Sequence, residues 1–207
     1  MGIFSVDGGV ARFLTRLGNL FVLNLLTIVC SIPIFTVGAA MTALYTSALR
    51  LARNEEGALA AGYFKAFKEN FKQATIVWVF AGAAILFMSF DIWLLQSLTG
   101  SFGQVYRILL FVLILLFVLE LVYIFALLAR FENTIKNTIK NAVVLSIGKL
   151  VPAILILIGT ILPVLVLMIS YRFVIIDILI GASGPAYLAS LYFTKLFQRF
   201  EKERAYE

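Results

Sequence analysis

Long apolar runs separated by short basic connections dominate the pattern of residues along this chain. A helix that crosses the hydrocarbon of a bilayer needs about 20 apolar residues. Four segments readily reach that length: 74–97, 105–129, 149–170 and 173–195. The runs are continuous, as between Ile108 and Leu119, whereas strands of a membrane barrel alternate apolar and polar positions. The pattern therefore predicts membrane-spanning helices.

The first apolar region, 17–49, is too long for one span and short for two. Ser31-Ile32-Pro33 lies at its middle, and a proline removes a backbone donor and disfavours helix at the preceding residue. We therefore predict two helices that meet near Pro33, with Gly38 loosening the start of the second. A re-entrant hairpin that never fully crosses the bilayer is the alternative.

The distribution of lysine and arginine predicts the orientation. The basic ends and connections are 1–16, 50–72, 130–149 and 195–204. By contrast, the connections near 98–107 and 170–172 hold one arginine each, Arg107 and Arg172. Cytoplasmic loops carry an excess of basic residues, so the first set is expected in the cytoplasm together with both termini. An even number of crossings follows, and six fit if 17–49 crosses twice.

Composition supports the same fold class. Of the 207 residues, 62% are hydrophobic and 14% are charged, whereas soluble chains have about 45–50% and about 25%. The predicted fold is an all-α, polytopic transmembrane helical bundle of about six crossing helices. The net charge of +6 indicates contact with anionic lipid headgroups rather than with nucleic acid. The single cysteine, Cys30, cannot form an intrachain disulfide.

Two of the basic connections, 62–74 and 133–142, have an amphipathic helical pattern. Apolar residues recur on one face of each, and lysines lie on another. The residues concerned are Phe67, Lys68, Phe71 and Lys72 in the first, and Ile135, Lys136, Ile139 and Lys140 in the second. We predict that both form short helices in the cytoplasmic membrane interface. Such helices serve as lipid-surface anchors or as docking surfaces for a partner.

These two segments also align with each other, at an offset of about 68 residues. Each is followed by two predicted spans, so 62–129 and 130–197 are candidate tandem units within one transmembrane domain, 1–207. Because both units begin on the same side, they would be parallel repeats, an arrangement found in transporters. The alternative is that the two segments are similar only because both form the same kind of amphipathic helix.

Ionisable residues inside a span cost about 2.5–3.5 kcal/mol on the insertion scale, so each needs a reason. Glu120 lies near mid-depth of 105–129 and is a candidate site for a cation, a proton or a polar substrate. The alternative is a carboxyl group that a polar side chain on a neighbouring helix satisfies. Asp91 and Asp177 lie nearer the outer face, as do the two arginines named above, and interfacial pairing is expected there. An outer binding vestibule is the alternative.

Two irregular points interrupt the predicted helices. The residues that mark them are Pro33 and Gly38 in the first region, and Gly181, Gly184 and Pro185 inside the last span. Broken helices free backbone groups at membrane depth, and transporters use such breaks to hold substrates or ions. The alternative is a tolerated kink with close packing through small residues.

The string Gly181-Ala182-Ser183-Gly184 is similar to the nucleophile motif of rhomboid proteases, which use a serine and a histidine. The chain contains no histidine, so Ser183 has no such base to activate it. A protease is therefore rejected. No phosphate-binding glycine loop or metal-ligand cluster occurs in the sequence, and we predict neither a cofactor nor an enzymatic activity.

Several short strings of residues carry a resemblance to a known family. They are Cys30-Ser31-Ile32-Pro33, Ala43-Leu44-Tyr45, Glu55-Glu56-Gly57, Phe67-Lys68-Glu69-Asn70-Phe71-Lys72-Gln73 and Ala129-Arg130-Phe131-Glu132-Asn133. Together they resemble the YesL-like family of bacterial integral membrane proteins, which has no established activity. Its members often lie beside genes for carbohydrate uptake, especially sugar importers of the ATP-binding cassette type.

The resemblance implies a bacterial plasma-membrane protein that is a non-enzymatic accessory or subunit of carbohydrate uptake. Its expected partners are the permease or ATPase subunits of such an importer. An autonomous small-solute transporter or channel is one alternative, and a structural, lipid-organising protein is another. Assembly into a homo-oligomer is compatible with each of these alternatives.

Overall fold

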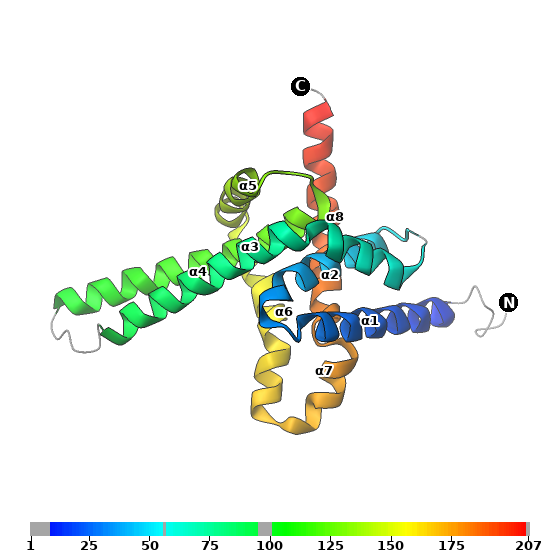
Figure 1. The fold of residues 1–207 in the computed structure, drawn as a ribbon, viewed down its shortest axis with the longest axis horizontal. Coiled ribbons are helices and arrows are strands. Elements are labelled where there is room, and N and C mark those ends of the chain that lie inside the picture. Colours follow the sequence, from blue (N-terminus) through cyan, green and yellow to red (C-terminus); the bar gives the residue numbers. More distant parts are fainter. Residues whose placement is uncertain (1–8, 56, 95–100, 206–207) are drawn as a thin grey trace.

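The computed structural model describes residues 9–55, 57–94 and 101–205, and the regular structure of these residues is entirely helical (Figure 1). This confirms the predicted all-α fold class. In chain order the elements are α1 (Gly9–Ser31), η1 (Ile34–Thr36), α2 (Val37–Ala52), α3 (Leu59–Leu94), α4 (Ser101–Arg130), α5 (Ile135–Gly148), α6 (Leu150–Ile169), η3 (Tyr171–Phe173), α7 (Val174–Ile180) and α8 (Ser183–Ala205).

Within the described residues, five helices are long and apolar enough to cross a membrane. Residues Tyr171–Ile180 and Ser183–Phe200 are bent by 45° at a short break, and they provide a sixth crossing if the pair is one span. The chain is therefore a multi-pass membrane protein. The end of the predicted span 74–97 lies outside the described residues.

The predicted break near Pro33 is confirmed. Helix α1 ends at Ser31, a single 3₁₀ turn follows, and α2 begins at Val37. Pro33 itself has extended backbone angles, φ −74° and ψ 113°. Region 17–49 thus contributes two of the candidate membrane helices instead of one.

One predicted boundary is wrong. Segment 62–74 is not a separate interfacial helix, because α3 runs without interruption from Leu59 to Leu94. No glycine or proline occurs between Tyr63 and Ala81 to end it. At 1.5 Å per residue, its 36 residues extend about 54 Å, well beyond a hydrocarbon core of about 30 Å. The second segment does form a separate helix, α5, which ends at Gly148.

Helix α2 lies at the centre of the fold and packs against α1, α3, α4 and α8. Its buried face is built largely from small residues such as Ala39, Ala43 and Ala48. At Gly38 the approach to α3 is so close that a Cβ atom would lie 2.5 Å from the carbonyl oxygen of Ala74. Membrane helices associate through such small residues because lipid tails provide no hydrophobic drive between helices.

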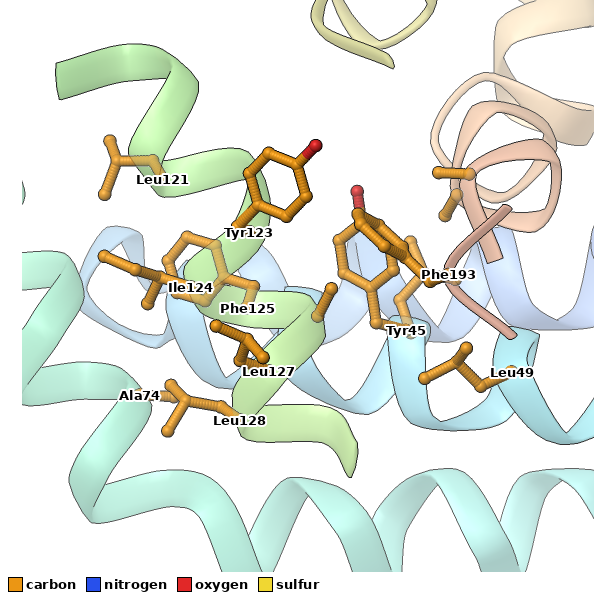
Figure 2. Close-up of a cluster of buried hydrophobic side chains, with 14 of the residues drawn as sticks. Tyr45, Leu49, Ala74, Leu121, Tyr123, Ile124, Phe125, Leu127, Leu128 and Phe193 are labelled. Atoms are coloured by element: carbon orange, nitrogen blue, oxygen red, sulfur yellow. The ribbon is translucent and has the colours of Figure 1, made fainter. Parts of the chain in front are cut away.

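A buried aromatic cluster joins the three helices α2, α4 and α8 (Figure 2). The ring of Phe193 in α8 lies edge-on to Tyr45 of α2, with centroids 6.0 Å apart, and to Tyr123 of α4, with centroids 5.5 Å apart. Edge-on pairs place the positive ring edge of one residue against the negative face of another. Contacts between residues so far apart in the chain fix α8 against the centre of the fold.

Two apolar hairpins, α3–α4 and α6–α7, extend from this centre in different directions (Figure 1). Their outer parts expose large apolar side chains, as at Phe80, Phe87 and Ile169, with exposed fractions of 73%, 67% and 83%. Lipid tails solvate such side chains at no cost, whereas water does not. The exposed hairpins are therefore the lipid-facing part of the protein.

We expect Gly38→Ala to destabilise the protein by about 1–3 kcal/mol, because the added methyl group overlaps the α3 backbone. Gly82→Ala in α3 is the matched control, since a Cβ there meets nothing within 4 Å. Thermal unfolding in detergent, followed by size-exclusion chromatography, measures both variants. Equal midpoints for the two variants would contradict the close α2–α3 contact.

Candidate functional site

The break between α7 and α8 contains the side chain of Asn24 from α1. Its amide nitrogen donates to the carbonyl oxygens of Asp177, at 2.9 Å, and Ile178, at 2.7 Å. Its amide oxygen accepts from the backbone nitrogens of Ala182, at 2.8 Å, and Ser183, at 3.0 Å. The amide thus stands between the Ile178 carbonyl and the Ala182 N–H, which would bond to each other in a continuous helix.

This arrangement uses the full capacity of the asparagine side chain. An amide has two N–H donors and a carbonyl oxygen with two lone pairs. Asn24 is fully buried, so no water competes for these groups. Asn24 is not among the candidate residues predicted from the sequence. A polar amide inside an apolar span is the signal that could have identified it, because such a residue needs a partner on another helix.

Of the predicted break residues, Gly181 has a specific steric role. A Cβ atom there would overlap the carboxylate of Asp177, which folds back over the break. At Gly184, by contrast, a Cβ would make an ordinary contact of 3.7 Å with Ile180. Pro185 is in the first turn of α8, where a missing N–H disrupts no helical hydrogen bond.

The break near Pro33 is also closed by internal side chains. The hydroxyl of Thr36 donates to the carbonyl oxygens of Cys30 and Pro33, each at 2.6 Å. The indole nitrogen of Trp78 in α3 donates to the Ile34 carbonyl at 2.8 Å. Three carbonyl groups at this break therefore have partners inside the protein.

The candidate carboxylates do not form one site. Glu120 is half-buried on α4, and no hydrogen bond to its side chain occurs within the described residues. Asp91 is near the end of α3, and Asp177 is at the second break. The expected interfacial pairing is absent from the described part of the chain, where neither aspartate forms an ion pair with Arg107 or Arg172. Arg107 instead donates to the Gly103 carbonyl of its own helix, at 3.2 Å.

The two predicted docking segments are joined by a direct contact. Gln73, in the first segment, donates from its amide nitrogen to the Asn133 carbonyl, at 3.1 Å. Asn133 immediately precedes the N-cap of α5, Thr134, whose hydroxyl accepts from the Asn137 backbone nitrogen. The end of the first segment therefore lies beside the residues that lead into the second, whereas α3 and α5 themselves are not among the closely packed helix pairs.

Residues at matching positions of the two segments have matching environments. Phe67 and Ile135 are half-buried and pack against the core, Phe71 and Ile139 are exposed, and Ala74 and Ala142 are fully buried. The four lysines, Lys68, Lys72, Lys136 and Lys140, are all exposed. The tandem units 62–129 and 130–197 remain a prediction.

The helices and their closed breaks define a multi-pass, all-α membrane protein. A family described as "Protein of unknown function, DUF624" matches residues 20–92, which extend from α1 nearly to the end of α3. No curated protein matches the chain, and no solved structure does. The matched range includes Asn24, the Pro33 break and the first basic segment.

We expect Asn24→Ala to destabilise the fold by about 2–4 kcal/mol, because it removes hydrogen bonds that average about 0.6 and reach about 1.7 kcal/mol each in membranes. The unfolding midpoint in detergent should fall by about 5 °C or more. Asn137→Ala, at an exposed position of α5, is the matched control. An unchanged midpoint for Asn24→Ala would refute the role of its amide in closing the break.

Proposed function

We propose that this chain is a non-enzymatic membrane accessory protein that docks a transport partner through its basic helices. The observation that carries the proposal is the Gln73–Asn133 hydrogen bond, which brings the end of the first amphipathic segment to the start of the second. Here we call the exposed surface of these two segments the docking face. It consists of the exposed lysines and the exposed Phe71 and Ile139 named above.

The docking face has the composition of an interaction surface. Phe71 and Ile139 are 37% and 40% exposed, and they lie among four exposed ammonium groups. Apolar anchors surrounded by a polar rim are typical of helix-mediated recognition. The rim charges favour an acidic partner surface and accelerate association with it.

The identity of the partner is part of the proposal. The resemblance to the YesL-like family supports a place beside carbohydrate importers of the ATP-binding cassette type, and the match to the unknown-function family over residues 20–92 is compatible with it. The partners would then be permease or ATPase subunits in a bacterial plasma membrane. The basic segments and both termini would lie in the cytoplasm, as the positive-inside rule expects.

The closed breaks favour this proposal over a transport pathway through the breaks. Transporters hold ions and substrates with backbone groups that a broken helix leaves free. Here, Asn24, Thr36 and Trp78 already bind the freed groups. Both breaks are therefore stabilised by hydrogen bonds to side chains of the protein itself.

Reversing the charge at Lys68, Lys72, Lys136 and Lys140 to Glu should reduce co-purification of importer subunits by about tenfold or more, because like charges then face each other. The measurement is gentle detergent extraction from the native host, followed by mass spectrometry of the proteins that co-purify. Lys195→Glu with Arg199→Glu, on the exposed face of α8, is the matched control.

Unchanged recovery of importer subunits with the fourfold variant would rule out the docking face. Equal losses in the control variant would show general charge repulsion instead of a specific surface. A wild-type preparation without any importer subunit would refute the proposed partner itself.

A second candidate, an autonomous small-solute transporter or channel, has one observation in its favour. Within the described residues, Asp177 Oδ1 and Ser183 Oγ at the second break are buried without a hydrogen-bond partner. Glu120 provides a further half-buried carboxyl group at membrane depth. Unpartnered polar atoms inside a membrane are commonly parts of ion or proton pathways.

If the transporter function holds, proteoliposomes that contain only this chain should transport solutes or protons, and Glu120→Gln or Asp177→Asn should lower the rate by about tenfold. Asp91→Asn, near the end of α3, is the control. No transport across a broad solute panel would eliminate this candidate. A lipid-organising role would then remain, with altered lipid association on loss of the basic helices and no solute movement.

A further inference from the structure

The open end of the α1–α2 pair contains a basic pocket that is separate from the docking face. Its volume is about 440 Å³. It lies between the first half of α1, the end of α2 and the connection that leads to α3. The pocket residues from the two helices are Arg12, Thr15, Arg16 and Asn19 of α1, and Ser47, Arg50 and Leu51 of α2, and Asn54 follows just beyond α2.

The spacing of these residues explains how the pocket forms. On α1 they recur at i, i+3, i+4 and i+7, and on α2 Ser47, Arg50 and Leu51 recur at i, i+3 and i+4, which places each set on one face of its helix. Asn54 lies beyond the end of α2, where the backbone has a positive φ of 55°. Because the chain reverses at the Pro33 break, the start of α1 lies beside the end of α2, and the two faces meet. The pocket therefore depends on the same break that divides region 17–49 into two helices.

Positive charge predominates in the pocket. The described lining residues include three arginines, Arg12, Arg16 and Arg50, and one carboxylate, that of Glu55. Glu55 is shared, since its two oxygens lie 3.5 Å from Arg50 Nε and 2.5 Å from Arg53 Nε. The hydrogen bond from Arg53 lowers the pKa of Glu55, so this carboxylate remains ionised at neutral pH. Within the described part of the chain, Arg12 and Arg16 pair with no carboxylate.

Two of the arginines are held in position by neutral groups. The guanidinium of Arg16 donates to the Tyr187 hydroxyl at 2.9 Å and to the Asn54 side-chain oxygen. The guanidinium of Arg50 lies against Gly57 and Gly62, where a Cβ atom would be only 2.9 Å and 2.8 Å from its nitrogens. The contacts of Arg16 orient its guanidinium without neutralising it, whereas Arg50 also pairs with Glu55.

We propose that this pocket binds a phosphate group. The planar fork of a guanidinium matches phosphate oxygens with two parallel hydrogen bonds, and the polar side chains of Asn19 and Ser47 add neutral donors at the wall. The same chemistry is present in a lipid headgroup and in a soluble phosphate ester. Phe13 and Leu14 of α1, which are 61% and 60% exposed, would lie beside the acyl chains of a bound lipid.

Binding to the purified full chain in maltoside detergent, which contains no phosphate, tests the proposal and separates the two sources. The soluble probe is glycerol 3-phosphate, the lipid probe is phosphatidic acid, and diacylglycerol with the same acyl chains is the phosphate-free control. Calorimetry is used for the soluble probe, and native mass spectrometry for the lipids. Arg12→Gln is the test variant because Arg12 is exposed and forms no ion pair in the described residues. Arg199→Gln, on α8, is the matched control.

We expect at least one phosphate probe to bind, with Arg12→Gln weakening its binding about tenfold and Arg12→Lys restoring part of the loss, since Lys keeps the charge without the fork. Binding of glycerol 3-phosphate assigns a soluble ligand, and binding of phosphatidic acid alone assigns a lipid headgroup. The proposal is overturned if neither probe binds, if diacylglycerol binds as well as phosphatidic acid, or if Arg199→Gln weakens binding as much as Arg12→Gln. The docking face is not part of this measurement, so either proposal can fail alone.

Discussion

The architecture of this protein depends on one side chain, the amide of Asn24, and on the way it closes the break between α7 and α8. In hydrocarbon, a backbone group without a partner costs several kcal/mol, and no water is present to supply one. One amide can bond to four backbone groups, and Asn24 does so across the break. The first long helix and the last broken span, which are more than 150 residues apart, are thereby fastened together.

The same rule operates at the Pro33 break, where Thr36 and Trp78 bind the freed carbonyl groups. With both breaks closed, α2 can lie at the centre of the fold, between neighbours on all sides. Polar groups in the interior are thus used mainly for structure. Most of the charged groups instead lie outside the most apolar segments, where water is available and ionisation costs little, and Glu120 of α4 is an exception.

Two basic surfaces result, and they differ in chemistry. The docking face carries lysines, which are strongly hydrated point charges on flexible stems and suit the rim of a protein contact. The pocket at the open end of α1 and α2 carries arginines, whose planar forks suit phosphate oxygens, and neutral neighbours hold the fork of Arg16 in position. The two proposals therefore concern separate surfaces, so that a protein partner and a phosphate group would not compete for the same residues.

The sequence by itself determined the membrane class, the position of most spans, and the breaks near Pro33 and Gly181, because these follow from the length of apolar runs and from the local backbone limits of proline and glycine. It also predicted which lysines are exposed. Only the tertiary structure decided that segment 62–74 is continuous with α3, that Gln73 contacts Asn133, and that Asn24 closes a break beyond residue 176. These features depend on contacts between distant residues. Local hydrophobic periodicity predicts where a helix forms, but it does not determine which helix packs against which.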